Sequence, residues 1–425
     1  MRSLLILLAL GLSVQDVPVR DLIQKLEDDR ADAREKAQKD LVALGDAAVP
    51  ALREILESTR SSGELKLRAA AVIKEIDLAA KAAKVYREFK PLSITATDRT
   101  LREVLDEVAR LAEVKIDPAT VDGAAKVSID AKDDTLFEVL DQLCRDQSER
   151  TWEALEDGSI RMSRDRHVSA PAVYGGPFRV RIQSMNAQRN NDFKAARTVV
   201  MTVTLQADWD KRLKPSKVVD IDLTRAVDDQ GTALDIKAFD GNMVFRGGPG
   251  VQLRVGVGMA MDSMDNTRSF MFSNVSPTAA SIELEGTARY TFPLDQREIK
   301  FEKPGVTETR EVGDTTIRLN RAGNPENWTL SFHRAPSAAA TGWGRTIAQR
   351  FDSDSFVVVD QDGGEFPVTM RPQNRGRLQP EETGVWYQAF VQRNGGKALK
   401  EVRFRFVDQT LVKAMPFKFT GLALP

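Results

Sequence analysis

The chain is poor in the residue types that most enzyme and metal sites use. It contains two histidines and one cysteine among 425 residues. A disulfide framework needs paired cysteines and a structural zinc site needs about four Cys or His ligands, so both are excluded. Lys and Arg together number 61, against 62 Asp and Glu. The chain therefore lacks the broad positive field that non-specific binding to nucleic acid requires, and we expect no nucleic-acid partner.

Long apolar runs are also scarce. Arg2 precedes an apolar run from Leu4 to Leu12, which ends before the charged Asp16. The run is about half the ~20 residues that a membrane-spanning helix needs, and no later run approaches that length. The pattern predicts a signal peptide over residues 1–15, an exported protein of the periplasm or cell surface, and no transmembrane segment in the mature chain. The alternative is a frayed helix of a cytoplasmic protein.

The composition is that of a folded protein with several domains. Hydrophobic residues make up 42% and charged residues 29%, which is typical of globular chains. At roughly 150 residues per domain, the length allows about three domains. Periodicity predicts a multidomain α+β fold with a short α-helical repeat segment, a small βαββαβ domain and two antiparallel β-sandwich domains.

Residues 16–90 place apolar side chains at helical spacing, as in Leu22 and Leu26 and again in Leu41 and Leu44. The segments from Arg34 to Gln38 and from Leu44 to Leu52 resemble a HEAT-like helical repeat. The resemblance covers one repeat and a fragment, and it implies a surface for protein interactions. A helical spacer is an equally good interpretation, because stacked repeats usually need about three units for stability.

The region 91–168 contains an internal repeat. The sequence Thr-Leu-Arg-Glu-Val-Leu-Asp, starting at Thr100, returns from Thr135 with one change. In each copy Thr and Glu are spaced as in a capping box, which predicts the start of an amphipathic helix. Strand-like segments flank both helices, and they predict the order β-α-β-β-α-β with a final hairpin turning at Asp157 and Gly158.

The run from Val127 to Asp133, followed by the helix from Thr135 and an aromatic strand, resembles the secretin and TonB short N-terminal domain. This resemblance implies a small non-enzymatic periplasmic module that docks envelope proteins and has no catalytic residues. The barrel pattern expected of a pore or receptor does not follow after residue 168. Residues 91–168 have a net charge of −7, from 11 basic and 18 acidic side chains. This charge favours a basic partner, or simply keeps a small domain well solvated.

Residues 169–176 are predicted to be a linker. Beyond it, short strand-like segments alternate with turns, which predicts one β-sandwich over residues 177–303 and a second over 304–425. Two motifs recur in this part. The first is at 226–231 and 358–363, and the second is at 289–296 and 403–409. The recurrence suggests that the two sandwiches are related.

Few residues are candidates for chemistry. His167 and His333 are the only histidines, and neither lies beside a serine nucleophile motif, so we expect no histidine-dependent enzyme. Cys144 lies on a predicted apolar helix face and is interpreted as a core residue. We therefore expect no catalytic residue and no cofactor.

Paired carboxylates are the remaining candidates for a metal site. Asp228 with Asp229 and Asp360 with Asp362 are weak calcium ligands at predicted turns, and Asp220 with Asp222 is a third pair. The same residues are what hairpin turns commonly use. Four tryptophans are candidates for stacking on a sugar or for ordinary core packing: Trp209, Trp328, Trp343 and Trp386.

These patterns predict an exported, non-catalytic scaffold of the bacterial envelope that docks a protein partner and is linked to a secretin or TonB-type system. The alternative is a secreted surface protein that binds calcium or carbohydrate through its β-sandwiches.

Overall fold

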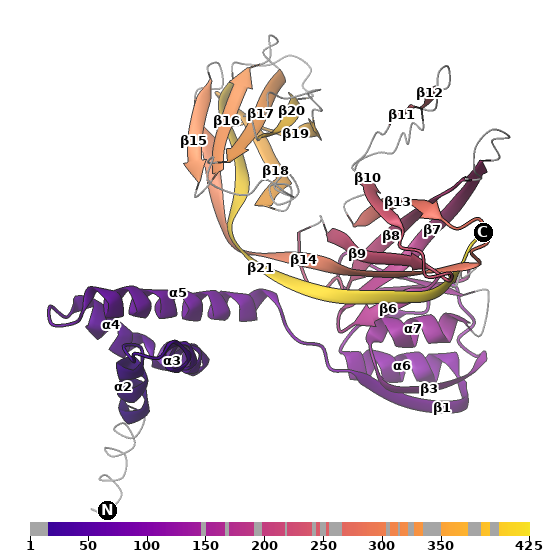
Figure 1. The fold of residues 1–425 in the computed structure, drawn as a ribbon, viewed down its shortest axis with the longest axis horizontal. Coiled ribbons are helices and arrows are strands. Elements are labelled where there is room, and N and C mark those ends of the chain that lie inside the picture. Colours follow the sequence, from indigo (N-terminus) through magenta and orange to yellow (C-terminus); the bar gives the residue numbers. More distant parts are fainter. Residues whose placement is uncertain are drawn as a thin grey trace, which may run out of the picture. The chain divides into compact units, whose positions relative to one another are not determined.

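The computed structural model describes residues 16–145, 150–165, 170–190, 198–216, 219–239, 244–246, 252–254, 266–302, 307–312, 315–321, 327–334, 350–372, 384–391 and 399–425. The predicted signal peptide lies outside these residues. In the described part, the fold is mixed α+β and mostly β, with several antiparallel sheets (Figure 1). The coarse fold class predicted from the sequence is confirmed.

The chain divides into two compact units, and the first ends at Arg87. This unit consists of the helices α2 (Asp16–Lys25), α3 (Ala31–Leu44), α4 (Val49–Glu57) and α5 (Gly63–Val85), with the 3-10 turn η1 (Gly45–Ala47). Their apolar faces form one core: Val19, Ile23, Leu26, Ala37, Leu41, Ala48, Leu52, Leu65, Ala69, Val72 and Ile76. Among the described residues, no helix combines the length and apolar character needed to cross a membrane.

The second unit begins with a small α/β module, residues 91–163. Its elements are β1 (Leu92–Thr100), α6 (Leu101–Ala112), β2 (Ile116–Asp117), β3 (Lys126–Asp134), α7 (Leu136–Arg145), β4 (Thr151–Ala154) and β5 (Ile160–Ser163). Strand β1 pairs with β3, and β5 lies between β2 and β4. The elements follow one another in the order β-α-β-β-α-β-β.

Both helices of the module start as the repeated motif predicts. Thr100 accepts a hydrogen bond from the Glu103 backbone N–H, and the Glu103 carboxylate accepts one from the Thr100 N–H, which completes a capping box. Thr135 accepts in the same way from the Glu138 N–H. These bonds satisfy backbone donors that the first helical turn would leave unpaired. The predicted helix starts are confirmed.

The first β region, residues 172–301, follows the module. It consists of β6 (Ala172–Gly175), β7 (Phe178–Asn190), β8 (Thr198–Trp209), β9 (Asp220–Asp228), β10 (Asp235–Phe239), β11 (Val244–Arg246), β12 (Gln252–Arg254), β13 (Thr267–Val275) and β14 (Ser281–Phe301). One sheet has the order β10-β13-β8-β7-β6. The prediction of a linker over 169–176 is wrong at residues 172–175, because β6 pairs there with β7.

The second β region, residues 308–423, consists of β15 (Glu308–Val312), β16 (Thr315–Arg321), β17 (Asn327–Arg334), β18 (Phe351–Asp360), β19 (Glu365–Pro372), β20 (Gly384–Val391) and β21 (Leu399–Ala423). A sheet runs β15-β16-β17-β20-β19-β18-β21-β14-β9. The predicted division near residue 304 does not separate two sheets. Strand β21 pairs with β14 from Ser281 to Phe301, so the two regions share their longest strands (Figure 1).

Candidate functional site: a buried ionic cluster

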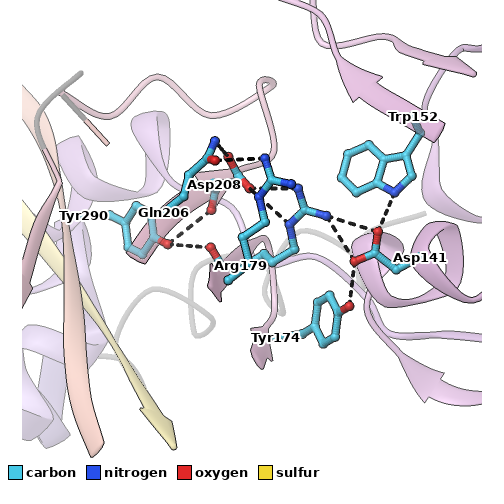
Figure 2. Close-up of polar contacts among 8 residues, drawn as sticks. Asp141, Trp152, Tyr174, Arg179, Gln206, Asp208 and Tyr290 are labelled. Atoms are coloured by element: carbon cyan, nitrogen blue, oxygen red, sulfur yellow. Dashed lines mark hydrogen bonds and ion pairs between the residues drawn. The ribbon is translucent and has the colours of Figure 1, made fainter. Parts of the chain in front are cut away.

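A charged cluster is buried where the module meets the first β region. Arg179, near the start of β7, forms ion pairs with Asp141 of α7 and Asp208 of β8, with N···O distances of 3.1 and 2.8 Å. The side chains of Arg179 and Asp141 are each only 9% exposed. Figure 2 shows the arginine between the two carboxylates. Because isolated buried charges are costly, the three side chains depend on one another.

Asp141 is the residue of the module at which most contacts of the cluster meet. It follows Phe137 by four residues on α7 and is therefore on the same buried helix face. Its carboxylate accepts hydrogen bonds from the Trp152 indole N–H at 2.7 Å and the Tyr174 hydroxyl at 2.6 Å, in addition to Arg179. These bonds join α7, β4, β6 and β7 at one carboxylate.

Aromatic rings cover the guanidinium group of Arg179. Its Cζ atom lies 4.5 Å from the ring centroid of Trp152 and 5.5 Å from that of Phe137. The two rings are themselves stacked, with centroids 5.0 Å apart. A cation that is desolvated over aromatic faces gains cation–π attraction. The rings therefore stabilise the same charge that the carboxylates neutralise.

The other end of the cluster lies in the first β region. Gln206 donates a hydrogen bond to Asp208 at 3.0 Å and accepts one from Arg181 at 2.9 Å. The hydroxyl of the fully buried Tyr290 lies 3.2 Å from the carbonyl oxygen of Asp208. Strands β7, β8 and β14 therefore meet at this end of the cluster, with Tyr290 of β14 bonded to the backbone of β8.

The pKa directions fit a fixed structural cluster. Burial alone would lower the pKa of Arg179, but the neighbouring Asp208 and Asp141 outweigh it and raise the pKa. Burial, followed by the hydrogen bond to Asp141, raises the pKa of Tyr174. Burial also raises the pKa of Tyr290. Arg179, Tyr174 and Tyr290 therefore keep their protons at neutral pH.

A second set of contacts joins the module to the same β region. Arg212, in the loop after β8, donates hydrogen bonds to the carbonyl oxygens of Ala112 and Glu113 at 2.6 and 3.0 Å. These carbonyls lie at the C-terminal end of α6, where a cation is favourable. Lys214 donates to the Glu156 carbonyl oxygen at 2.9 Å. The module is therefore attached at two places.

The structure uses the predicted calcium candidates in turns. Asp228 is buried, and its Oδ1 accepts hydrogen bonds from the backbone N–H groups of Gln230 and Thr232. Asp229 accepts from the Ala280 N–H. Burial alone would raise the pKa of Asp228, but the backbone donors outweigh it and lower the pKa. The two carboxylates therefore bind backbone N–H groups of their own turn and of the turn between β13 and β14.

Asp360 of the second pair is used in a turn in the same way as Asp228. Asp360 accepts hydrogen bonds from the N–H groups of Asp362 and Gly364, while Asp362 is exposed. Asp220 forms ion pairs with Arg268 and Arg289. Within the described ranges, no three His, Cys, Asp or Glu side chains come together as metal ligands.

The structure describes some of the histidine, cysteine and tryptophan candidates and not others. His333 lies on β17 with a ring nitrogen 2.9 Å from the Ser331 hydroxyl, Cys144 is buried in the module core, and Trp209 is buried. His167, Trp343 and the side chains of Trp328 and Trp386 lie outside the described residues.

Sequence reasoning missed the ionic cluster. Asp141 is the last residue of the repeated heptapeptide, and its counterpart Asp106 is exposed. An aspartate on the apolar face of α7, followed by Trp152, was the available signal. Its partner Arg179, and Asp208 on the other side of Arg179, lie in later strands, so only the tertiary fold brings the three side chains together.

Comparisons with known proteins do not identify a family. No family model matches the chain, and no curated protein matches it. One match among solved structures is the crystal structure of the conserved domain protein from Bacillus anthracis. The alignment spans 64% of this chain and 93% of the other, with 8% sequence identity and a TM-score of 0.12. A likeness at this level supports no conclusion on fold or function.

Proposed function

We propose that this protein is an exported, non-catalytic scaffold of the bacterial envelope that docks a protein partner on the module. On this proposal the module acts as a secretin or TonB short N-terminal domain, and the helices before it act as a HEAT-like spacer. The observation that carries the proposal is the attachment of the module to the first β region. Its buried charges are bound to the first β region, while its acidic surface faces solvent.

The outer surface of the module is suited to binding an extended segment. The sheet of β1 and β3 has two strands, and each strand has one edge without a strand neighbour among the described residues. Residues of the inner face, such as Ile94 and Ile129, are buried, whereas Thr95, Ser128 and Asp130 are exposed. A strand edge without a strand neighbour, beside a polar outer face, is suited to accept an added strand from a partner.

Charge gives this surface a preferred partner. The module's net charge of −7 comes partly from side chains that the fold leaves exposed: Glu103, Asp106, Asp117, Asp122, Asp130 and Asp133. An acidic surface steers basic segments and disfavours acidic ones. The partner that fits best is therefore a protein with a basic, extended segment.

The rigid attachment supports docking better than signalling within the chain. Arg179 and Arg212 hold α7 and the end of α6 against the first β region. A module held in this way keeps its binding surface in one geometry, which reduces the entropy lost on binding.

Charge reversal on the exposed surface tests the proposal. Tagged full-length protein and the double variant Asp106→Lys/Asp130→Lys would be isolated from the native envelope after mild crosslinking. We expect the variant to lose its envelope partner, with affinity at least about tenfold lower for the purified pair, because two attractive charges become repulsive.

The matched control is Glu54→Lys/Glu57→Lys on α4, which makes the same change in net charge on exposed residues outside the module. Equal recovery of the partner with both double variants would reject the module as the docking site. Circular dichroism of each variant checks that the fold is retained.

A further inference from the structure

The two β regions place their strands in the same order. The first has a sheet with the order β10-β13-β8-β7-β6, and five strands of the second run β19-β20-β17-β16-β15. Every neighbouring pair in both series is antiparallel. The long strands also correspond, because β9 pairs with β14 as β18 pairs with β21. Seven strands of one region therefore match seven of the other in chain order.

The recurring motif at residues 226–231 and 358–363 forms the same turn twice. The backbone N–H of Asp228 donates to the carbonyl oxygen of the residue four positions later, and its Oδ1 accepts from the N–H of that same residue. Asp360 makes the same two bonds. Gly231 and Gly363 both have positive φ, +81° and +86°, a conformation that glycine adopts without strain.

The second recurring motif lies on the two strands that the regions share. Arg289 of β14 faces Ala414 of β21, and Lys300 of β14 faces Arg403 of β21. The recurrence makes Arg289 and Arg403 corresponding residues of the two regions. The strand that carries the motif in one region therefore pairs antiparallel with the strand that carries it in the other.

Each long strand ends in the core of the other region. The second half of β14 contributes Ile299 and Phe301 to the core that contains Phe332 and Phe404 of the second region. Figure 1 shows β14 and β21 running side by side between the two regions.

The second half of β21 is buried in the first region in the same way. Met415 and Phe417 are both 4% exposed. The Phe417 ring occupies the space above Gly286 of β14, where an added Cβ would lie 2.6 Å from its Cζ atom. On the outer side, Lys418 forms ion pairs with Glu283 and Glu285 of β14 at 3.0 and 2.8 Å. Shape and charge therefore both fit this strand to its acceptor.

We propose that residues 172–423 are two copies of one seven-stranded unit that have exchanged the second halves of their last strands. Each copy carries a strand-binding surface, and the partner that fits it is the last strand of the other copy. Neither copy completes its core with its own chain alone. This is an interaction inside the chain, and it stands apart from the docking of an envelope partner.

Cutting the connection between the copies tests the exchange in the full chain. Residues 303–306 would be replaced by a specific protease site, and the purified protein would be cut without denaturant. We expect the two pieces to co-elute at the mass of the intact protein and to unfold in one urea transition. Two closed domains would separate on the column or unfold independently, and that result would overturn the proposal.

Single substitutions show whether β21 holds the pieces together. In the cut protein, Met415→Asp places a charge at a buried position and is expected to release the pieces. Val412→Asp is the matched control, since Val412 lies on the same strand but is 49% exposed, and its pieces should stay together. Equal behaviour of the two variants would count against the exchange.

A crosslink checks the register without relying on stability. Arg289→Cys with Ala414→Cys places two thiols on directly opposed residues, within the distance that a disulfide can bridge. After the cut, we expect the pieces to remain joined on a non-reducing gel. The off-register pair Arg289→Cys with Lys418→Cys should not join them. A joined off-register pair, or an unjoined in-register pair, would overturn the proposed strand pairing.

Discussion

Arg179 is the residue on which the attachment of the module most depends. Replacing it with Met removes the ion-pair partner of the buried Asp141 and leaves Asp208 with the partly exposed Arg181 as its remaining partner. We expect Arg179→Met to lower the free energy of unfolding by roughly 3–5 kcal/mol, measured by urea denaturation and near-UV circular dichroism. The control is Arg181→Met, because Arg181 is 36% exposed and a partly exposed pair contributes about 1 kcal/mol or less. Similar losses in both variants would contradict the special role of Arg179.

Cys144 gives the protein a pH dependence at alkaline pH. Burial raises the pKa of this thiol to about 12, against about 8.5 in an unfolded chain. Because the pKa of the thiol is higher in the folded state, its contribution to the free energy of unfolding is complete below pH 8. That contribution is lost as the pH rises towards 12. From pH 8 to pH 10, this one group should reduce the free energy of unfolding by about 2 kcal/mol.

The variant Cys144→Ala removes that contribution. Its stability should fall less between pH 8 and pH 10 than that of the unmodified chain, as urea unfolding at each pH would show. The native thiol should also resist alkylation at pH 8, because it is buried and protonated. Rapid alkylation, or identical pH profiles for the two proteins, would contradict the buried environment.

At the scale of elements, the helix starts of the module depend on their caps. Thr100→Ala removes the acceptor for the Glu103 N–H, and we expect a loss of about 1 kcal/mol in the free energy of unfolding. Thr100→Ser keeps the hydroxyl, so its loss in the free energy of unfolding should be only a few tenths of that of Thr100→Ala. Thr135→Ala on α7 should behave as Thr100→Ala does. No difference between the Ala and Ser variants would show that the capping bond contributes little.

Elements that depend on local pattern could be predicted from the sequence. The repeated heptapeptide fixed the starts of α6 and α7, because Thr and Glu at that spacing satisfy their own helix turn. Strand β6 could not be predicted in this way. It lies in residues 169–176, a short segment that contains glycine and proline and has no strand pattern of its own. The segment becomes a strand because β7 pairs with it and the Tyr174 hydroxyl donates to Asp141.

For the whole molecule, the local sequence pattern predicted two separate sandwiches. In the structure the two regions are joined instead, because β14 and β21 pair along their length. A motif such as that at residues 403–409 signals a strand and says nothing of its partner. The pairing of β21 with β14 depends on a glycine, Gly286, that leaves room for Phe417. Such matches between residues more than 100 positions apart are invisible to periodicity. Arg179 and Asp141 are only 38 positions apart, but they lie on a strand and a helix of different parts of the fold, so periodicity could not pair them either.

The division at Arg87 leads to a prediction for the whole chain. The four helices before it have one core of their own, so a fragment of residues 16–87 should fold alone, with a helical circular dichroism spectrum and cooperative thermal unfolding. A single core in about 70 residues rarely supplies more than about 5 kcal/mol, so the fragment should be only marginally stable. Leu41→Ala removes a fully buried side chain at a cost of about 2–5 kcal/mol. This substitution should unfold the fragment, whereas Leu67→Ala, at a position 75% exposed, should leave it folded. An unstructured wild-type fragment would show that these helices need the rest of the chain, as an incomplete repeat array would.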